Sequence, residues 1–197
     1  MKINELSISG SWIIEFNKFK DIRGYFYESF RSDLLIKELQ RNFIITQTNT
    51  SLSSKGSLRG IHYALVPPGQ AKFIQCQHGA IQDFIIDIRI GSPTYGQYQM
   101  IELNEGSANA IFIEEGLAHA FVALEDNSVV TYYVNQTYNP EREKGINPFD
   151  QELNISWPKI DLKLSEKDQK EISLSKAKEL NLLPSFNAVK SYIKTLV

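Results

Sequence analysis

Between Ser11 and Ile155 the chain is a succession of short apolar runs, each about the length of one β-strand. Turn residues separate the runs, for example Pro67-Pro68-Gly69 and Gly91-Ser92-Pro93. This pattern is typical of a β-sandwich or barrel, and a double-sheet jelly roll of this kind can enclose a ligand cavity. We therefore predict an all-β jelly roll. The expected strands are Trp12–Phe16, Tyr25–Phe30, Phe43–Thr50, Leu58–Ala64, Lys72–Gln77, Ala80–Arg89, Gln97–Leu103, Ala110–Ile113, His119–Leu124 and Val129–Val134.

Helical patterns occur only at the margins of this β-rich region. Ser32 to Arg41 is a short amphipathic candidate, and Ser165-Glu166-Lys167-Asp168 has the Ser-x-x-Asp pattern that can cap a helix. At 197 residues and 42% hydrophobic, the chain can bury one core. We expect one jelly-roll domain over residues 1–180 and a helical tail over residues 181–197, packed on the body or on a partner subunit. The tail's apolar residues at helical spacing are Phe186, Val189, Tyr192, Ile193 and Leu196.

The charge distribution and the apolar runs exclude several classes of partner. The formal net charge is −2, and the lysines and arginines are scattered, so no basic field follows a nucleic-acid backbone. Cys76 is the single cysteine, and the first residues lack the apolar stretch of a secretion signal. The longest apolar runs have the length of strands rather than membrane spans. We expect a cytoplasmic protein that binds neither nucleic acid nor membrane.

Polar residues interrupt the apolar strands at three places that together suggest proton-transfer chemistry. These are Arg59-Gly60-Ile61-His62, Gln70-Ala71-Lys72, and the pair Tyr132 and Tyr138. Moving a proton on a carbon acid requires a base, a positive group for the developing enolate oxygen, and an acid. Histidine, lysine and tyrosine can fill these roles. Taken singly, the histidine is more often a core residue and the lysine an exposed edge charge.

Strand periodicity decides which of these side chains can share a cavity. Strict alternation places Arg59 on the face opposite to His62, so both can face one cavity only if a bulge at Gly60 breaks the pattern. Gln47 and Asn49 alternate on one face of their strand. They either point into a polar interior or form cross-strand amide pairs.

The three histidines do not form a recognisable metal-binding pattern. His62, His78 and His119 include no His-x-His pair, and no nearby carboxylate completes a ligand set. His78 is expected in a hairpin turn, and His119 either donates to an anionic ligand or caps a turn. The chain also lacks a Gly-rich dinucleotide loop and a Gly-x-Ser-x-Gly motif. We predict no metal and no redox cofactor.

Several sequence blocks occur in the order and spacing of the dTDP-4-dehydrorhamnose 3,5-epimerase family, which the chain resembles over about residues 10–180. A set of blocks at consistent spacing is far more specific than any one block. The blocks are Asp21-Ile22-Arg23-Gly24-Tyr25-Phe26-Tyr27-Glu28, Gln47-Thr48-Asn49, Arg59-Gly60-Ile61-His62-Tyr63, Gln70-Ala71-Lys72, Asp87-Ile88-Arg89, Ser92-Pro93-Thr94-Tyr95-Gly96, His119-Ala120-Phe121, Tyr138-Asn139-Pro140 and Ser165-Glu166-Lys167-Asp168.

The resemblance implies a cupin-type jelly roll that acts on a nucleotide-linked 4-keto-6-deoxyhexose without metal or organic cofactor. It also implies a homodimer in which amino-terminal strands pair with the partner's sheet. By position, His62 is similar to the family's base, Asp168 to its charge partner, Tyr132 to the acid and Lys72 to the enolate stabiliser. The positions that resemble substrate-binding ones are Arg23, Phe26, Glu28, Gln47, Asn49, Arg59, His119, Tyr138, Glu143 and Lys167.

Two departures from the family pattern concern the choice of substrate. His119-Ala120-Phe121 stands where His-Gly-Phe is common, and Asn147-Pro148-Phe149-Asp150 replaces a frequent Trp-x-Asp. The second change resembles the branch that serves unusual deoxysugars. Members of the family invert C3, C5 or both carbons. Two alternatives stay open: a 3,4-ketoisomerase on the same substrate class, and a non-catalytic sugar-binding jelly roll.

Overall fold

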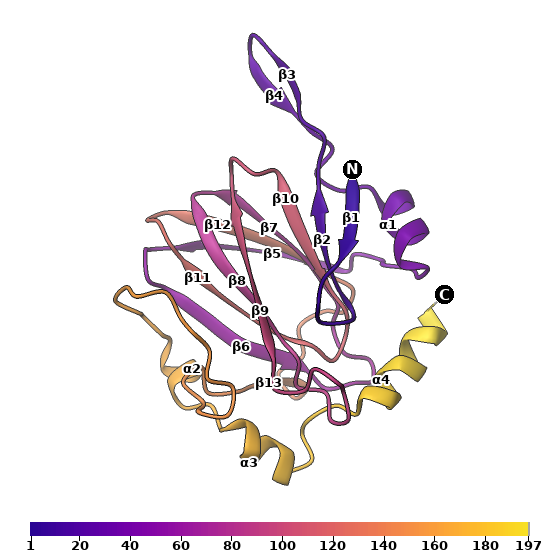
Figure 1. The fold of residues 1–197 in the computed structure, drawn as a ribbon, viewed down its shortest axis with the longest axis vertical. Coiled ribbons are helices and arrows are strands. Elements are labelled where there is room, and N and C mark those ends of the chain that lie inside the picture. The colour runs from indigo at the N-terminus through magenta and orange to yellow at the C-terminus, as the bar shows by residue number, and fades with distance from the viewer. Residues whose placement is uncertain (197) are drawn as a thin grey trace.

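Two antiparallel sheets lie face to face in the computed structural model, which describes residues 1–196 (Figure 1). The larger sheet has the order β1 (Lys2–Glu5), β2 (Ser11–Glu15), β10 (Asn109–Ile113), β7 (Lys72–His78), β12 (Ser128–Val134) and β5 (Gln47–Ser53). The smaller sheet has the order β13 (Glu143–Gly145), β6 (Leu58–Ala64), β11 (Ala118–Ala123), β8 (Ala80–Ile86) and β9 (Tyr98–Asn104). The predicted double-sheet jelly roll is confirmed.

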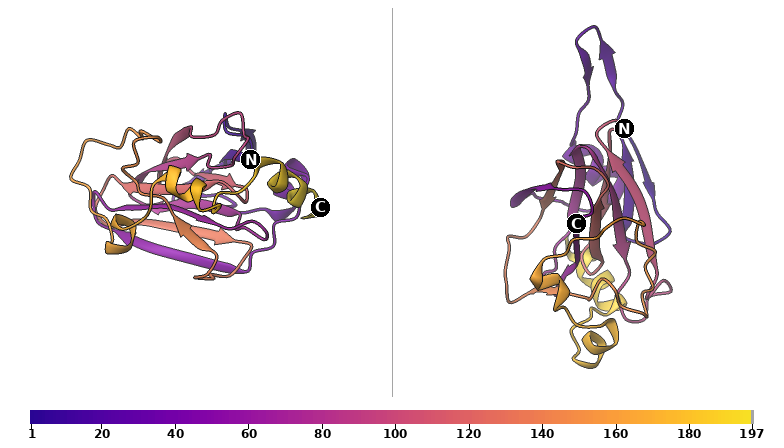
Figure 2. Two further views of the ribbon diagram at one scale, coloured as in Figure 1. Left: turned by 90° about the horizontal axis from the view of Figure 1, so that it is seen from below. Right: turned by 90° about the vertical axis from the view of Figure 1, so that its left-hand side faces the viewer.

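A separate hairpin of β3 (Phe19–Asp21) and β4 (Gly24–Phe26) projects from the body (Figures 1 and 2). Four of its large apolar side chains are exposed: Phe19 by 60%, Ile22 by 106%, Tyr25 by 49% and Phe26 by 65%. Apolar residues gathered on one projecting element are typical of a surface that another molecule covers.

Most predicted strand boundaries agree with the structure to within a residue, but three predicted strands are wrong in extent. The strand predicted at Ala80–Arg89 is observed as β8, which ends at Ile86, because Asp87 and Arg89 form a buried ion pair of 2.7 Å with each other. The strand predicted at Phe43–Thr50 is observed as β5, which begins at Gln47, because Phe43 packs edge-on against Phe112.

The third of these, Tyr25–Phe30, ends at Phe26 because the following aromatic residues cover the outer face of the larger sheet. Tyr27 stacks on Phe16, and Phe30 packs edge-on against Phe73. Three short strands that the sequence analysis did not predict, β1, β3 and β13, consist mainly of polar or exposed residues without an apolar alternation.

Apolar side chains fill three layers around the two sheets. Between the sheets lie Ile74, Ile85, Phe121 and Val130, with others of the same cluster. Helix α1 (Ser32–Leu39) covers the outer face of the larger sheet, where Leu35 is buried. The carboxy-terminal third of the chain covers the smaller sheet. The inner layer stops short of one end of the sandwich, and a cavity opens there.

The helices lie at the margins, as expected from the sequence (Figure 2), although no separate helix was expected at Leu174–Glu179. The predicted cap is confirmed: the Ser165 hydroxyl accepts a hydrogen bond from the Asp168 amide and begins α2 (Glu166–Gln169). Helix α3 (Leu174–Glu179) follows, and then the predicted tail with α4 (Phe186–Ile193) and a 3-10 turn (Lys194–Leu196). Val197 of the predicted tail lies outside the described residues. No helix within residues 1–196 has the length and apolar character of a membrane span.

A bulge at Gly60, the condition for Arg59 and His62 to share one cavity, is present in β6. His62 pairs with His119 and Arg59 pairs with Phe121, so Ala120 alone stands opposite the two residues Gly60 and Ile61. An extra residue on one strand reverses the alternation beyond it. The side chains of Arg59 and His62 therefore face the same cavity.

Gly60 is required at this bulge for two reasons. Its φ of +130° lies in the left-handed region, and a Cβ there would lie 2.4 Å from the Cβ of Ala120. Gly91, with φ +84°, has no atom within 4 Å of an added Cβ and provides a matched control.

We expect Gly91→Ala to lower the free energy of unfolding by about 1–2 kcal/mol, the cost of the backbone conformation alone. Gly60→Ala should cost at least about 3 kcal/mol, because the strand contact adds to it. Urea unfolding of both variants measures the difference. Equal losses would contradict the close contact at Gly60.

Candidate active site

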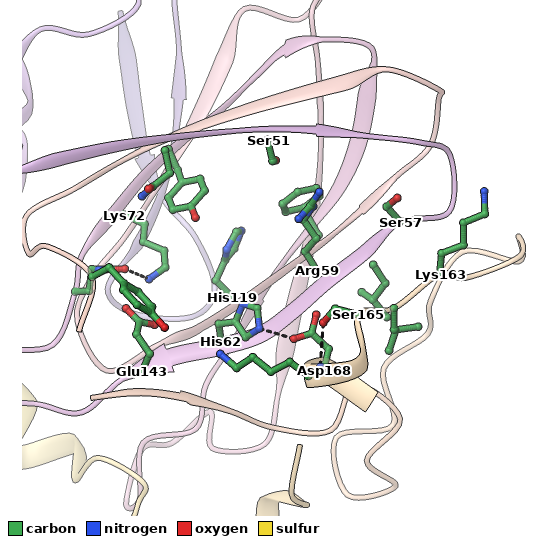
Figure 3. A pocket seen from close by; sticks show the side chains of 18 of the residues that line it. Ser51, Ser57, Arg59, His62, Lys72, His119, Glu143, Lys163, Ser165 and Asp168 are labelled. Carbon is green, nitrogen blue, oxygen red and sulfur yellow. Dashed lines mark hydrogen bonds and ion pairs between the residues drawn. The ribbon is translucent and has the colours of Figure 1, made fainter. Parts of the chain in front are cut away.

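A cavity of about 630 Å³ opens between the two sheets and has the size of a small-molecule site (Figure 3). Most of the side chains around it are polar, in contrast to the apolar layer farther inside. Its lining residues are Gln47, Asn49, Ser51, Ser54, Ser57, Leu58, Arg59, His62, Gln70, Lys72, His119, Phe121, Tyr132, Tyr138, Glu143, Lys163, Leu164, Ser165, Lys167 and Asp168.

Each sheet provides one wall of the cavity. The smaller sheet contributes Arg59 and His62 from β6 and His119 from β11. The larger sheet contributes Lys72 and Tyr132, among others. Lys72 lies directly opposite Val134 of β12, so these two side chains point to the same face of the sheet. Tyr132 lies two residues before Val134 on β12, so the side chains of Tyr132 and Lys72 both point to the inner face.

His62 is oriented by a carboxylate from outside the sheets. Its Nε2 lies 2.8 Å from Oδ1 of Asp168, which is 4% exposed in α2 (Figure 3). Burial acts to raise the pKa of Asp168, but the hydrogen bonds with His62 and Ser165 outweigh it, so this pKa lies below its usual range. Asp168 is therefore ionised at neutral pH. With Nε2 donating to it, Nδ1 is the nitrogen of His62 with a free lone pair.

A second histidine pairs with a second carboxylate on the same wall. His119 Nε2 lies 2.7 Å from Oδ2 of Asp83 on β8, and both residues are buried. Burial raises the pKa of Asp83, although His119 opposes the effect. Asp83 was not predicted as a site residue because it lies inside an apolar run. The signal was available, since a carboxylate within a buried strand requires a partner.

Lys72 is a buried cation rather than an edge charge. It lies on β7, an interior strand of the larger sheet, and is 7% exposed. Its Nζ donates to Oε1 of Gln70 at 2.7 Å. Burial lowers the pKa of Lys72, and the charges of Glu143 and Glu115 oppose that shift.

The two tyrosines occupy different environments. Tyr132 is half-buried, and burial with the charge of Glu143 raises its pKa, so it is a proton donor at neutral pH. Tyr138 lies in the loop after β12 and is 60% exposed. Its amide donates to Gln47 Oε1 at 2.9 Å. Gln47 in turn donates to Asn49 Oδ1 at 2.7 Å, so these amides pair along one strand and not across strands.

Three predicted site residues lie outside this cavity. Arg23 and Phe26 are on the projecting hairpin, where Arg23 pairs with Asp21. Glu28 follows the hairpin and forms an ion pair of 3.0 Å with Arg31. The other predicted residues all line the cavity, including Glu143 and Lys167.

The cavity also contains residues that the sequence analysis did not assign to a site, chiefly Gln70, Lys163 and a row of serines. Loop lysines and serines carry no periodic signal that separates them from ordinary surface residues. Within residues 1–196 no three or more histidine, cysteine or acidic side chains form a cluster that could hold a metal.

A family model described as dTDP-4-dehydrorhamnose 3,5-epimerase matches residues 5–176 of the chain. The chain belongs to the dTDP-4-dehydrorhamnose 3,5-epimerase family. The resemblance inferred from the sequence blocks is thereby confirmed.

Relatives of this family member include epimerases of two kinds. The dTDP-4-dehydrorhamnose 3,5-epimerase of Mycolicibacterium smegmatis is 40% identical over 100% of this chain and 97% of its own length. The dTDP-4-dehydrorhamnose 3-epimerase of Streptomyces niveus is 38% identical over 94% of this chain and 90% of its own length. A solved structure of ChmJ, a 3'-monoepimerase from Streptomyces bikiniensis in complex with dTDP-quinovose, superposes with a TM-score of 0.94 at 37% identity and covers 97% of each chain. Overall similarity therefore does not separate 3-epimerases from 3,5-epimerases.

Proposed function

We propose that this chain is an epimerase that inverts C3, C5 or both carbons of a dTDP-linked 4-keto-6-deoxyhexose through an enolate. The observation that carries the proposal is the distribution of groups over the two walls. A histidine with its carboxylate lies on one wall, and a protonated tyrosine with a buried lysine lies on the other. The names of the relatives, 3,5- and 3-epimerases of dTDP sugars, support the substrate class.

In the proposed reaction the C4 ketone acidifies the neighbouring C–H bonds. His62 removes a proton through Nδ1, and the electron pair of the broken bond moves into the C4 oxygen as an enolate. The Lys72 ammonium, which is buried in the wall of the cavity, stabilises that charge. Tyr132 then returns a proton from the opposite face, which inverts the carbon.

The remaining polar residues serve to bind the nucleotide and the sugar. Arg59 and Lys167 offer positive charge to the diphosphate, and guanidinium donors are well suited to phosphate oxygens. Tyr138, exposed at the cavity, offers an aromatic face to the base. We further propose that the reaction takes place in the cytoplasm and needs no metal or organic cofactor, since His62, Lys72 and Tyr132 already supply base, cation and acid.

We also propose that the chain forms a homodimer in which the β3–β4 hairpin reaches the partner. Two observations support this. The hairpin exposes four large apolar side chains, and the predicted binding residues Arg23 and Phe26 lie on it, outside the cavity of their own chain. In a symmetric dimer each hairpin can complete the cavity of the other protomer.

Incubation of the protein with dTDP-4-keto-6-deoxyglucose in D2O tests the proposed function. We expect deuterium at C3, C5 or both, with inversion. His62→Ala should lose exchange by at least about a hundredfold, as is typical when a general base is removed. Asp168→Asn should lose less of the exchange activity, because the base itself remains. Product NMR showing a 3-keto sugar would indicate a 3,4-ketoisomerase, and binding without deuterium incorporation would indicate a non-catalytic module.

Tyr132→Phe should separate exchange from inversion. Without the phenol, His62 still forms the enolate but returns a proton or deuteron only to the original face, so exchange persists while inversion fails. Tyr138→Phe is the matched control: it removes only the hydroxyl and keeps the aromatic face, so any effect should be on KM and not on the ratio of exchange to inversion. The measurement is the ratio of deuterium incorporated to product inverted. A wild-type ratio in Tyr132→Phe together with a raised ratio in Tyr138→Phe would assign the acid to Tyr138.

Mixing two impaired variants tests the dimer. If Arg23 acts in the partner's cavity, a heterodimer of Arg23→Ala and His62→Ala contains one intact cavity. Random re-association of equal amounts should restore about a quarter of wild-type activity. Each variant re-associated alone is the control. No recovery, despite heterodimers detected by native mass spectrometry, would place Arg23 and His62 in the same protomer's site.

A further inference from the structure

The position of Lys72 depends on a residue that neither the sequence blocks nor the proposed chemistry assigns a role. Among residues 1–196, the hydrogen-bond acceptor of Lys72 Nζ is Oε1 of Gln70 at 2.7 Å, the dashed line at Lys72 in Figure 3. The Gln70 Nε2 donates to the carbonyl of Gln136 at 3.1 Å. Because an ammonium only donates and a carbonyl only accepts, these two partners determine which way the amide points.

The segment that carries Gln70 and Lys72 is held from behind by a chain of hydrogen bonds that ends at a buried ion pair. The Ala71 amide donates to Asn135 Oδ1 at 2.8 Å, and Asn135 Nδ2 donates to Glu115 at 2.8 Å. Glu115 accepts two bonds from Arg41, at 2.6 and 2.8 Å, and both residues are buried. The backbone next to Gln70 is therefore connected through Asn135 to the buried pair of Glu115 and Arg41.

No carboxylate within residues 1–196 forms an ion pair with Lys72 inside 4.0 Å. The carboxylates that act on it are Glu143 from β13 and Glu115 from the turn before β11. The other ionisable groups around the cavity are Arg59, His62, His119, Tyr132, Tyr138, Lys163, Lys167 and Asp168. A carboxylate in direct contact would hold the ammonium and neutralise much of its field, whereas an amide oxygen holds it and leaves the full charge.

We propose that Gln70 is a positioning residue for Lys72: its neutral amide aims the ammonium into the cavity without cancelling its charge. The inference rests on the proposed function, because it takes Lys72 as the group that stabilises the enolate. Charge stabilisation of this kind is effective when the donor is oriented before the reaction.

A second cavity of about 170 Å³ lies on the other side of Gln70 and Glu143, which line both cavities. Truncation of Gln70 to alanine would join the two and admit water. Methionine, which has nearly the same length, removes the amide and leaves the wall in place. The informative variants are therefore Gln70→Met, without an acceptor for Lys72, and Gln70→Glu, with a charged one.

Two measurements test the proposal. The first is the ¹³C NMR titration of Lys72 in protein labelled at lysine, assigned with Lys72→Met. Gln70→Glu should move the Lys72 titration to higher pH, and Gln70→Met should move it to lower pH. The second is deuterium exchange at C3 and C5. In Gln70→Glu the kcat for exchange should fall at least about tenfold while KM changes less than about twofold.

In Gln70→Met the loss of kcat should be larger at pH 8 than at pH 6. Without its acceptor Lys72 titrates at lower pH, so a larger fraction of the buried amine is neutral at pH 8. Gln77→Glu is the matched control, with the same chemical change at the exposed end of β7, and should alter neither measurement. In a Lys72→Met background Gln70→Glu should cause no further loss, whereas a purely structural role of Gln70 predicts additive losses.

The two proposals fail separately. A wild-type protein that incorporates no deuterium contradicts the proposed epimerase, while the NMR titration still decides whether Gln70 controls Lys72. An unchanged Lys72 titration in both Gln70 variants overturns the positioning role, whatever the exchange rates are. A fall in kcat for Gln70→Glu that persists undiminished in the Lys72→Met background overturns it as well.

Discussion

The contact between Gly60 and Ala120 is the constraint on which the cavity depends. Because two residues of β6 stand opposite one residue of β11, the strand alternation reverses between Arg59 and His62. Without that reversal, Arg59 would point into the apolar layer beneath the carboxy-terminal third of the chain. With it, a guanidinium and an imidazole lie on the same wall, and Asp168 can reach the imidazole from α2. A single position that only glycine can occupy thus determines the chemistry of one whole wall.

The fold was largely predictable because strands and turns leave local signals. Apolar runs bounded by Gly, Pro and Asn located most strands of both sheets to within a residue. The failures have a common cause, since they involve residues whose conformation depends on distant partners. The sequence pattern predicts a strand through Asp87 and Arg89, but these residues form a buried ion pair. The short strand β13 forms only because β6 lies beside it. Periodicity within a short window contains no information on such partners.

The candidate site was predictable to the extent that its residues lie on regular strands or match the family's blocks. His62, Lys72, Tyr132 and Asp168 do come together around one cavity. Asp83 was missed because the apolar residues around it give the stronger signal, although a buried acid needs a partner. Gln70 was noted in the polar segment Gln70-Ala71-Lys72 but received no role, because a role for a neutral amide becomes apparent only once the neighbouring lysine proves to be buried. Whether the hairpin residues reach a cavity depends on a second protomer, which strand periodicity does not describe.

The division of the cavity between two sheets has a consequence for how such enzymes can diversify. The groups proposed to remove the proton are built into the smaller sheet and α2, while the groups proposed to hold the enolate and return the proton are built into the larger sheet. Among residues 1–196, His62 and Asp168 bond to each other and Lys72 bonds to Gln70, so the orientation of the base and that of the ammonium have separate supports. Proton removal by His62 can therefore be retained while the position of the acid on the larger sheet changes, and that position decides which face of the enolate receives the proton. The same scaffold is thus compatible with relatives that invert one centre and relatives that invert two.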